Sequence, residues 1–331
     1  MINLIKKYQN IFSVSGYEED LALEIVNDIK NVVDNIDTDA MGNLIAYKKG
    51  KDSSKKLMIA SHMDEIGFMV TNIEESGMVR VAPIGGINAV ASCYNEVRFR
   101  NGTVGLLIVE DGTKASDLSA SKLFVDIGAD SAAKAKRKVS IGDVCAVAPY
   151  FKKISSKRYA SKAFDDRVCC ALSVLAALAC EEPAYDTYYV FTVQEEVGCR
   201  GAKPSSFTVM PDYSIALDVT PVSAVGNPNH LTVKLGAGAA IKIKDSSVIC
   251  SPKMVERLTE LAKENDIKYQ YEVLLAGGTD TSQMQIAGSG SYACCISLPT
   301  RYVHTPVEMI DKDDLDACLD LLISFIENGV E

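Results

Sequence analysis

The spacing of apolar residues changes twice along the chain. A helical period and short apolar runs occupy the first 66 residues, short strand-like runs between turn residues fill 67–162, and longer helices and strands alternate afterwards. Alternating helices and strands are typical of an α/β domain, whereas many short strands are typical of a small barrel. We therefore predict an α/β/α domain with a central mixed sheet, formed by 1–66 and 163–331 and interrupted at 67–162 by a PDZ-like β-barrel.

Two local patterns precede the predicted insertion. Ser15 followed three residues later by Glu18 has the spacing of a capping box, and the period behind it predicts an amphipathic helix. The apolar positions of this helix are Leu21, Ile25, Val26, Ile29 and Val32. The apolar runs at 43–47 and 57–61 are predicted strands, and the lysine- and glycine-rich turn between them favours a hairpin or an edge pair.

Longer elements return after residue 163. In order, we predict a helix at 166–180, strands at 187–193 and 213–219, a helix begun by Ser251 and Pro252, a strand at 292–298 and a helix from Asp311. Within the predicted barrel, we expect one short helix at 130–140. The longest apolar run, 168–180, is shorter than the roughly 20 residues needed to cross a bilayer. We therefore expect a buried helix there, not a membrane span.

Composition narrows the possible partners and the compartment. The chain has 44 acidic and 34 basic residues and a net charge of −10, which disfavours nucleic acid and anionic membranes as partners. Its N-terminal segment lacks the continuous apolar stretch and the small-residue cleavage site of a secretory signal. Ten cysteines are spread along the chain without zinc-knuckle spacing, so we expect reduced thiols and a cytoplasmic protein.

The first candidate for chemistry is His62, at the end of a predicted strand. Asp64 follows two residues later, and in an extended segment residues at this spacing face the same side. Asp64 is therefore able to bind one ring nitrogen and leave the other for a metal. The alternative is a strand-end histidine beside a solvated aspartate.

Two pairs of adjacent carboxylates are the next candidates. Asp165 and Asp166 precede the apolar helix, where they would either cap it or let Asp165 bridge two cations through its two oxygens. Glu195 and Glu196 follow an apolar strand, where paired carboxylates are rarely buried without a positive partner. Because adjacent side chains diverge, one glutamate is able to bind a metal while the other transfers a proton. A solvated turn is the alternative.

Two further strand ends carry a potential ligand each. Asp218 ends the predicted strand at 213–219, and His304 follows the strand at 292–298. The ends of parallel strands are where sites form in open α/β sheets. The resulting set of imidazoles and carboxylates, without thiolate, suits catalytic Zn²⁺, Mn²⁺ or Co²⁺.

In combination, these segments resemble metallopeptidase family forty-two, the TET or glutamyl-aminopeptidase family. The motifs that carry the resemblance are HMDEIG, AFDDR, VQEEVG, ALDVT and RYVHTP, together with SVSGYE at 13–18, FVDIGADS and IGD within 124–143, and GGTDTS at 277–282. Their order and separations agree along nearly the whole chain. The resemblance implies an aminopeptidase acting on peptides, with an inserted barrel that serves assembly into a homo-oligomer, typically a tetrahedral dodecamer.

The resemblance also implies two divalent ions per subunit, Zn²⁺, Co²⁺ or Mn²⁺. Asp165 would bridge them, His62 and Asp218 would complete one site, and Glu196 and His304 would complete the other.

Other positions receive roles from the same resemblance. Glu195 would be the general base, Asp64 would orient His62, and a cis peptide bond would precede Asp166. The chain departs from the family where Asp166 replaces a frequent Asn, Thr305 a frequent Ser and Ile87 a frequent Trp, and none of these changes removes a ligand. Two alternatives stay open, namely a deacylase-type or glycan hydrolase and a non-catalytic peptide-binding or assembly protein.

Overall fold

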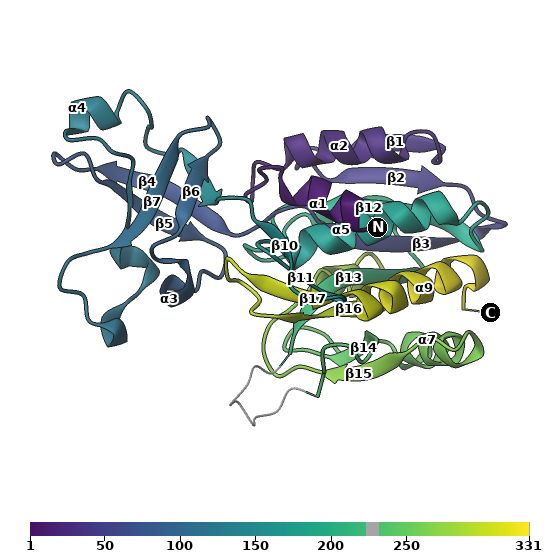
Figure 1. The fold of residues 1–331 in the computed structure, drawn as a ribbon. Coiled ribbons are helices and arrows are strands. Elements are labelled where there is room, and N and C mark those ends of the chain that lie inside the picture. Colours follow the sequence, from purple (N-terminus) through teal and green to yellow (C-terminus); the bar gives the residue numbers. More distant parts are fainter. Residues whose placement is uncertain (223–231, 331) are drawn as a thin grey trace.

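The computed structural model describes residues 1–222 and 232–330. Within these residues the chain forms an eleven-stranded sheet with helices on both faces and a closed antiparallel barrel at one end of it (Figure 1). This arrangement confirms the predicted α/β fold with an inserted barrel. No helix of the described residues is both long and apolar enough to cross a membrane.

The large sheet is mixed. Its strands are β1 (Asn35–Thr38), β2 (Leu44–Lys48), β3 (Asp52–His62), β10 (Phe151–Lys153), β11 (Arg158–Ser161), β12 (Tyr185–Thr192), β13 (Tyr213–Pro221), β14 (Ala239–Lys244), β15 (Tyr269–Val273), β16 (Tyr292–Arg301) and β17 (Glu308–Asp311). They follow the order β1-β2-β12-β3-β13-β16-β17-β11-β10, with β14 pairing β15 and β16. The neighbouring strands β12, β3, β13 and β16 are parallel, so their carboxyl ends lie at one edge of the sheet.

Helices cover the two faces of the sheet unequally. The larger layer contains α1 (Ile2–Gln9), α2 (Glu19–Ile29), α5 (Phe164–Ala179), α7 (Pro252–Glu264) and α9 (Lys312–Asn328), and the smaller contains α6 (Ala202–Val209) and α8 (Thr281–Gln285). Alternate residues of β3 face the two layers, because successive side chains of a strand point to opposite sides. Leu57 and Ile59 belong to the core under the larger layer, whereas Met58 and Ala60 pack with Met284 of α8.

The barrel has a core of its own. Its strands are β4 (Gly67–Ile73), β5 (Val79–Ile84), β6 (Glu96–Phe99), β7 (Val104–Val109), β8 (Leu123–Asp126) and β9 (Val144–Val147), with α3 (Ala89–Ser92), α4 (Ala132–Ala135) and the 3-10 turns η1 (Ala115–Asp117) and η2 (Ala120–Lys122) between them. The strands close in the order β4-β5-β8-β7-β6-β9 around buried residues such as Phe68, Val97 and Leu107. The chain then returns to the large sheet through β10.

Two local predictions are wrong. The runs at 43–47 and 57–61 do not pair with each other, because β12 lies between β2 and β3. Ser15 does not cap α2; its hydroxyl donates to Asp64 Oδ2 at 2.6 Å, and Glu18 stands at the N-cap position. In both cases a partner distant in sequence replaces the local one.

Arg167 is a buried cation at the centre of the larger layer, with no exposed surface. Its guanidinium donates to the backbone oxygens of Met63, Tyr8 and Ile11 and, at 2.8 Å, to Glu65 Oε1. Arg167→Met removes these donors and leaves the Glu65 carboxylate with less compensation. We expect the free energy of unfolding, measured by chemical denaturation, to fall by about 3–5 kcal/mol.

The matched control is Arg98→Met. Arg98 is half exposed and lies 3.8 Å from Glu96, a surface geometry that contributes little to stability. This variant should unfold within about 0.5 kcal/mol of the wild type. If the two substitutions lowered the free energy of unfolding equally, the buried hydrogen bonds of Arg167 would contribute no more to stability than a surface ion pair.

Candidate active site

The candidate residues meet beyond the carboxyl ends of the parallel strands. His62 is the last residue of β3 and pairs in register with Thr192 of β12, three residues before Glu195. Asp218 lies near the end of β13, and His304 follows β16. The parallel register therefore brings to one edge of the sheet side chains that are far apart in sequence.

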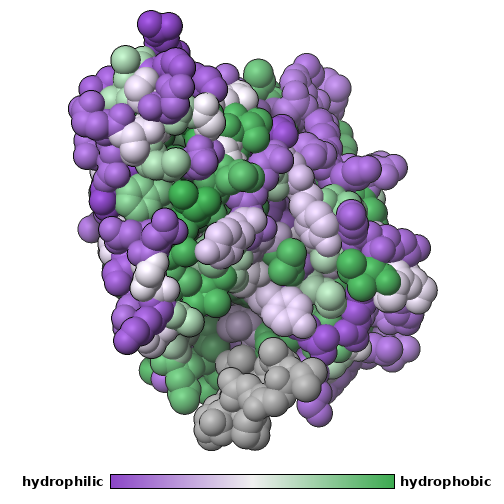
Figure 2. Space-filling model, turned by 60° about the vertical axis from the view of Figure 1, so that its left-hand side comes forward, coloured by the Kyte–Doolittle hydropathy of each residue, from purple (hydrophilic) through white to green (hydrophobic). Residues whose placement is uncertain are grey.

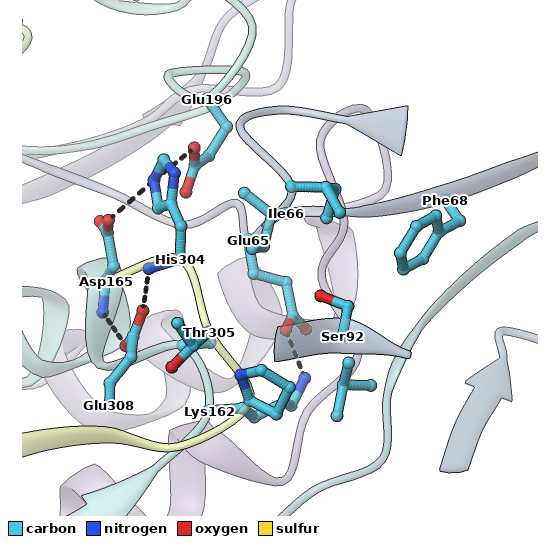
Figure 3. A pocket seen from close by; sticks show the side chains of 14 residues that line it. Glu65, Ile66, Phe68, Ser92, Lys162, Asp165, Glu196, His304, Thr305 and Glu308 are labelled. Atoms are coloured by element: carbon cyan, nitrogen blue, oxygen red, sulfur yellow. Dashed lines mark hydrogen bonds and ion pairs between the residues drawn. The ribbon is translucent and has the colours of Figure 1, made fainter. Parts of the chain in front are cut away.

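Asp165 lies between two imidazoles. Its Oδ1 is 3.0 Å from His62 Nε2, and its Oδ2 is 3.2 Å from His304 Nε2. His304 Nε2 is also 3.2 Å from Glu196 Oε2, and Figure 3 shows Asp165 and Glu196 flanking the same ring. The peptide bond between Asp165 and Asp166 is cis. Asp165 thus presents one oxygen to each of two potential metal ligands.

Asp64 holds the neighbouring groups in place. Its backbone oxygen is 3.1 Å from His62 Nδ1, whereas its carboxylate Oδ1 is 3.4 Å from the same nitrogen. The carboxylate accepts hydrogen bonds from the Ser15 hydroxyl and from the backbone N–H groups of Glu195 and Glu196, at 2.9 and 3.1 Å. The backbone oxygen of Asp64 is thus the nearer partner of the histidine, and its fully buried carboxylate accepts from the turn that carries both glutamates.

Glu308 performs a similar task on the other side, and the sequence did not single it out. Its Oε2 accepts from the backbone N–H of Asp165 at 3.1 Å, and its Oε1 accepts from the backbone N–H of His304 at 3.0 Å (Figure 3). The side chain is buried. Its signal in the sequence was its position four residues after His304, at the start of the next strand.

Glu195 and Asp218 lie near the His62 ring nitrogen that faces Asp165, beyond hydrogen-bond distance from it. Glu195 Oε2 is 3.9 Å and Asp218 Oδ1 is 4.0 Å from His62 Nε2. Asp166, whose Oδ2 accepts from the His62 backbone N–H, is the third member of one group with metal-like spacing, together with His62 and Asp218. A second such group contains His62, Asp165 and Glu196. The distances from His62 to Glu195 and to Asp218 are longer than hydrogen bonds, and both groups have the spacing of ligands around an ion.

The electrostatics of the cluster favour cations. Burial raises the pKa of Glu195 and of Asp218 well above the ordinary range of a carboxylic acid. Burial opposes the charged form of His304, but its hydrogen bonds to Asp165 and Glu196 raise its pKa to about 12. Among the described residues, Glu196 Oε1 and Asp166 Oδ1 are buried without a hydrogen-bond donor. Carboxylates in such numbers need compensating positive charge, and oxygen and imidazole donors fit divalent metals.

Two hollows adjoin the cluster. A cavity of about 690 Å³ is lined by Glu195, Asp218 and Lys242 on one side and by the loop 274–279 on another. A smaller cavity is seen in Figure 3. Phe68 and Ser92 of the barrel line it together with Lys162 and Thr305 of the α/β domain. Both reach Asp165, so molecules in either hollow have access to the cluster.

Comparisons with known proteins identify one family. The family model of the M42 glutamyl aminopeptidases matches residues 42–321. A protein of Acetivibrio thermocellus is 43% identical over 328 residues, covering 98% of both chains, and the lysyl aminopeptidase of Pyrococcus furiosus is 35% identical, covering 98% of this chain and 96% of its own. The Pyrococcus horikoshii TET1 peptidase, which can assemble into a tetrahedron or a large octahedral shell, superposes with a TM-score of 0.90 at 30% identity over 99% of both chains. The chain therefore belongs to the M42 family of aminopeptidases.

Proposed function

We propose that the chain is a dinuclear metal-dependent aminopeptidase that removes N-terminal residues from peptides. The observation that carries this proposal is Asp165, whose two oxygens face the Nε2 atoms of His62 and His304 at 3.0 and 3.2 Å. In the proposed centre Asp165 would contribute to both metal sites, with His62 and Asp218 as the other residues that would hold one ion and Glu196 and His304 as those that would hold the second. Zn²⁺, Co²⁺ and Mn²⁺ suit this donor set.

The residues around the centre divide the chemical work. Bound ions of this kind supply Lewis acidity and lower the pKa of water. Glu195 takes a proton from the attacking water and returns it to the leaving amine, a role that suits a carboxylate whose pKa is raised by burial. Asp64 holds the Glu195 backbone and so its direction. The acidic wall of the cavity, which includes Asp218 and Glu196, attracts the positively charged amino terminus of the substrate.

The test is hydrolysis of a panel of aminoacyl p-nitroanilides by protein reconstituted with Zn²⁺, Co²⁺ or Mn²⁺. We expect turnover that a chelator abolishes, and about two metal ions per chain by mass spectrometry. Hydrolysis of N-acylated amides in place of free aminoacyl substrates would favour the deacylase alternative. A protein with neither metal nor turnover would be the non-catalytic peptide-binding or assembly module.

We also propose that the barrel, with limits near 67 and 162, serves assembly into a homo-oligomer of tetrahedral form with twelve subunits. Two observations support this proposal. Apolar residues gather in a band on the face shown in Figure 2, and exposed apolar side chains of the barrel include Val90, Tyr94 and Leu106. A related peptidase forms a tetrahedron. Light scattering after size exclusion should give a mass far above 35.7 kDa, and a stable monomer would contradict it.

Asp64→Ala tests the support of the metal centre. The substitution leaves His62 Nδ1 without its carboxylate neighbour and removes the acceptor of the Glu195 and Glu196 N–H groups. We expect metal affinity, measured by competition with a chelator, to fall about 10–100-fold. Ser15→Ala, which keeps the carboxylate, is the control and should change the affinity far less. Equal affinities of Asp64→Ala and wild type would remove Asp64 from this role.

A further inference from the structure

A third group of ligand-type side chains lies beside the proposed dinuclear centre. One ligand atom each of Glu195, Cys199 and Asp280 lies within 4.8 Å of the other two. The Cys199 thiol donates to Glu195 Oε1 at 3.1 Å, and the two residues stand at opposite ends of one tight turn, in which the Cys199 N–H donates to the Glu195 carbonyl. Cys199 therefore contacts the side chain to which the proton transfer is assigned.

Asp280 contributes a buried oxygen without a partner. Its side chain is 3% exposed, and Thr192 donates to its Oδ2 at 2.5 Å. Its Oδ1 has no hydrogen-bond donor in the part of the chain that the structure describes. A buried carboxylate oxygen of this kind is costly unless a ligand satisfies it. The oxygen is an observation independent of the thiol, and it points to a positively charged ligand.

The geometry suits one small cation. With metal–sulfur and metal–oxygen distances of about 2.3 and 2.0–2.2 Å, ligand atoms of a tetrahedral site are roughly 3.5 Å apart. The 3.1 Å between Cys199 Sγ and Glu195 Oε1 is close to this spacing. Glu195 and Cys199 also line the cavity of about 690 Å³, which provides an entry path and space for a water as the fourth ligand.

The charge around the group selects for a thiophilic cation. Glu195 and Asp280 place two carboxylates against the thiol, which disfavours a free thiolate and favours a metal that binds sulfur and oxygen together. Lys242, which also lines the cavity, is paired with Glu272 at 2.7 Å.

We propose that Glu195, Cys199 and Asp280 bind a third divalent cation, such as Cd²⁺ or excess Zn²⁺, and that this cation inhibits hydrolysis by occupying Glu195. On binding, the Cys199 thiol releases its proton to solvent and a sulfur lone pair forms the bond to the metal, with no change of oxidation state. Inhibition rests on the proposed function, because it requires Glu195 to be the base. Binding itself does not depend on that function.

The test is a Cd²⁺ titration of protein already loaded with Zn²⁺. We expect one additional equivalent of Cd²⁺ per chain, an ultraviolet charge-transfer absorption from thiolate to cadmium, and at least a tenfold loss of hydrolysis over the same concentration range. Exchange of Cd²⁺ into the dinuclear centre produces no such absorption, because the two groups proposed there contain no cysteine.

Cys199→Ala and Cys199→Ser should abolish the absorption and raise the half-inhibitory Cd²⁺ concentration at least tenfold. Cys93→Ala is the matched control, since Cys93 is the other half-exposed thiol among the described residues and lies in the barrel; it should retain the absorption and the inhibition. Absorption that persists without Cys199, or that never appears in wild type, would overturn the site. If Cd²⁺ produces the absorption but does not inhibit hydrolysis, the inhibitory role is wrong. If the absorption appears in a protein that has no aminopeptidase activity, the cation site stands and the proposed function fails.

Discussion

Glu195→Gln is expected to lower kcat by about 10²–10⁴-fold while the protein keeps both metal ions. Glutamine preserves the size of the side chain, and the backbone N–H that donates to Asp64 at 2.9 Å is unchanged. The amide, however, is unable to take a proton from water. Steady-state kinetics on an aminoacyl p-nitroanilide would measure the loss, and mass spectrometry would measure the metal content of the same sample.

The neighbouring Glu196→Gln is the matched control for this result. Glu196 Oε2 lies 3.2 Å from His304 Nε2, so its substitution should remove a metal ligand and lower the metal content. The two variants differ by one position in the same turn, and only metal content separates a base from a ligand. Near-normal kcat in Glu195→Gln would show that the base assignment is wrong.

The sequence located this site because its members stand at strand ends. An apolar run that stops at His62, and another that stops shortly before Glu195, each identify one end of a buried strand from local pattern alone. Parallel pairing of β3, β12, β13 and β16 then brings those ends to one edge, which is the cluster that the strand ends and the family resemblance together predicted.

The failures have the opposite cause, because their partners are remote in sequence. The turn between 43–47 and 57–61 gives no sign that β12 will lie between the two strands. Ser15 has the local spacing of a helix cap, but the buried carboxylate of Asp64 is the acceptor that its hydroxyl binds. The helix α1 was not predicted either, since its buried residues Ile5 and Tyr8 span barely one turn and gain their stability by packing in the core with α5.

Burial also decides which acidic residues contribute to the site, and the sequence alone did not show which acidic residues are buried. Glu308 follows a proline-flanked loop and has the pattern of a solvated residue, yet it is 2% exposed and holds two backbone N–H groups of the centre. Asp280 lies in the motif GGTDTS, and its unpartnered oxygen becomes visible only when Thr192 and Cys199 are placed around it.

Asp165→Asn is expected to have the second large effect, with loss of at least one metal ion and a fall in kcat/KM of about 10³-fold or more. An amide offers one neutral oxygen where the carboxylate presents two charged ones, at 3.0 and 3.2 Å from His62 and His304. Loss of a metal ion would remove several kcal/mol of transition-state stabilisation. Metal analysis and initial rates measure both effects.

The control for this variant is Asp266→Asn. Asp266 is exposed, beyond the end of α7, and has a positive φ of 52° that asparagine adopts as readily. It should retain wild-type metal content and rate, so that any loss in Asp165→Asn reflects its place between the two histidines. If Asp165→Asn instead binds two ions as tightly as the wild type, the bridging role belongs to another carboxylate, and Asp166, which shares a group with His62 and Asp218, is the one to substitute next.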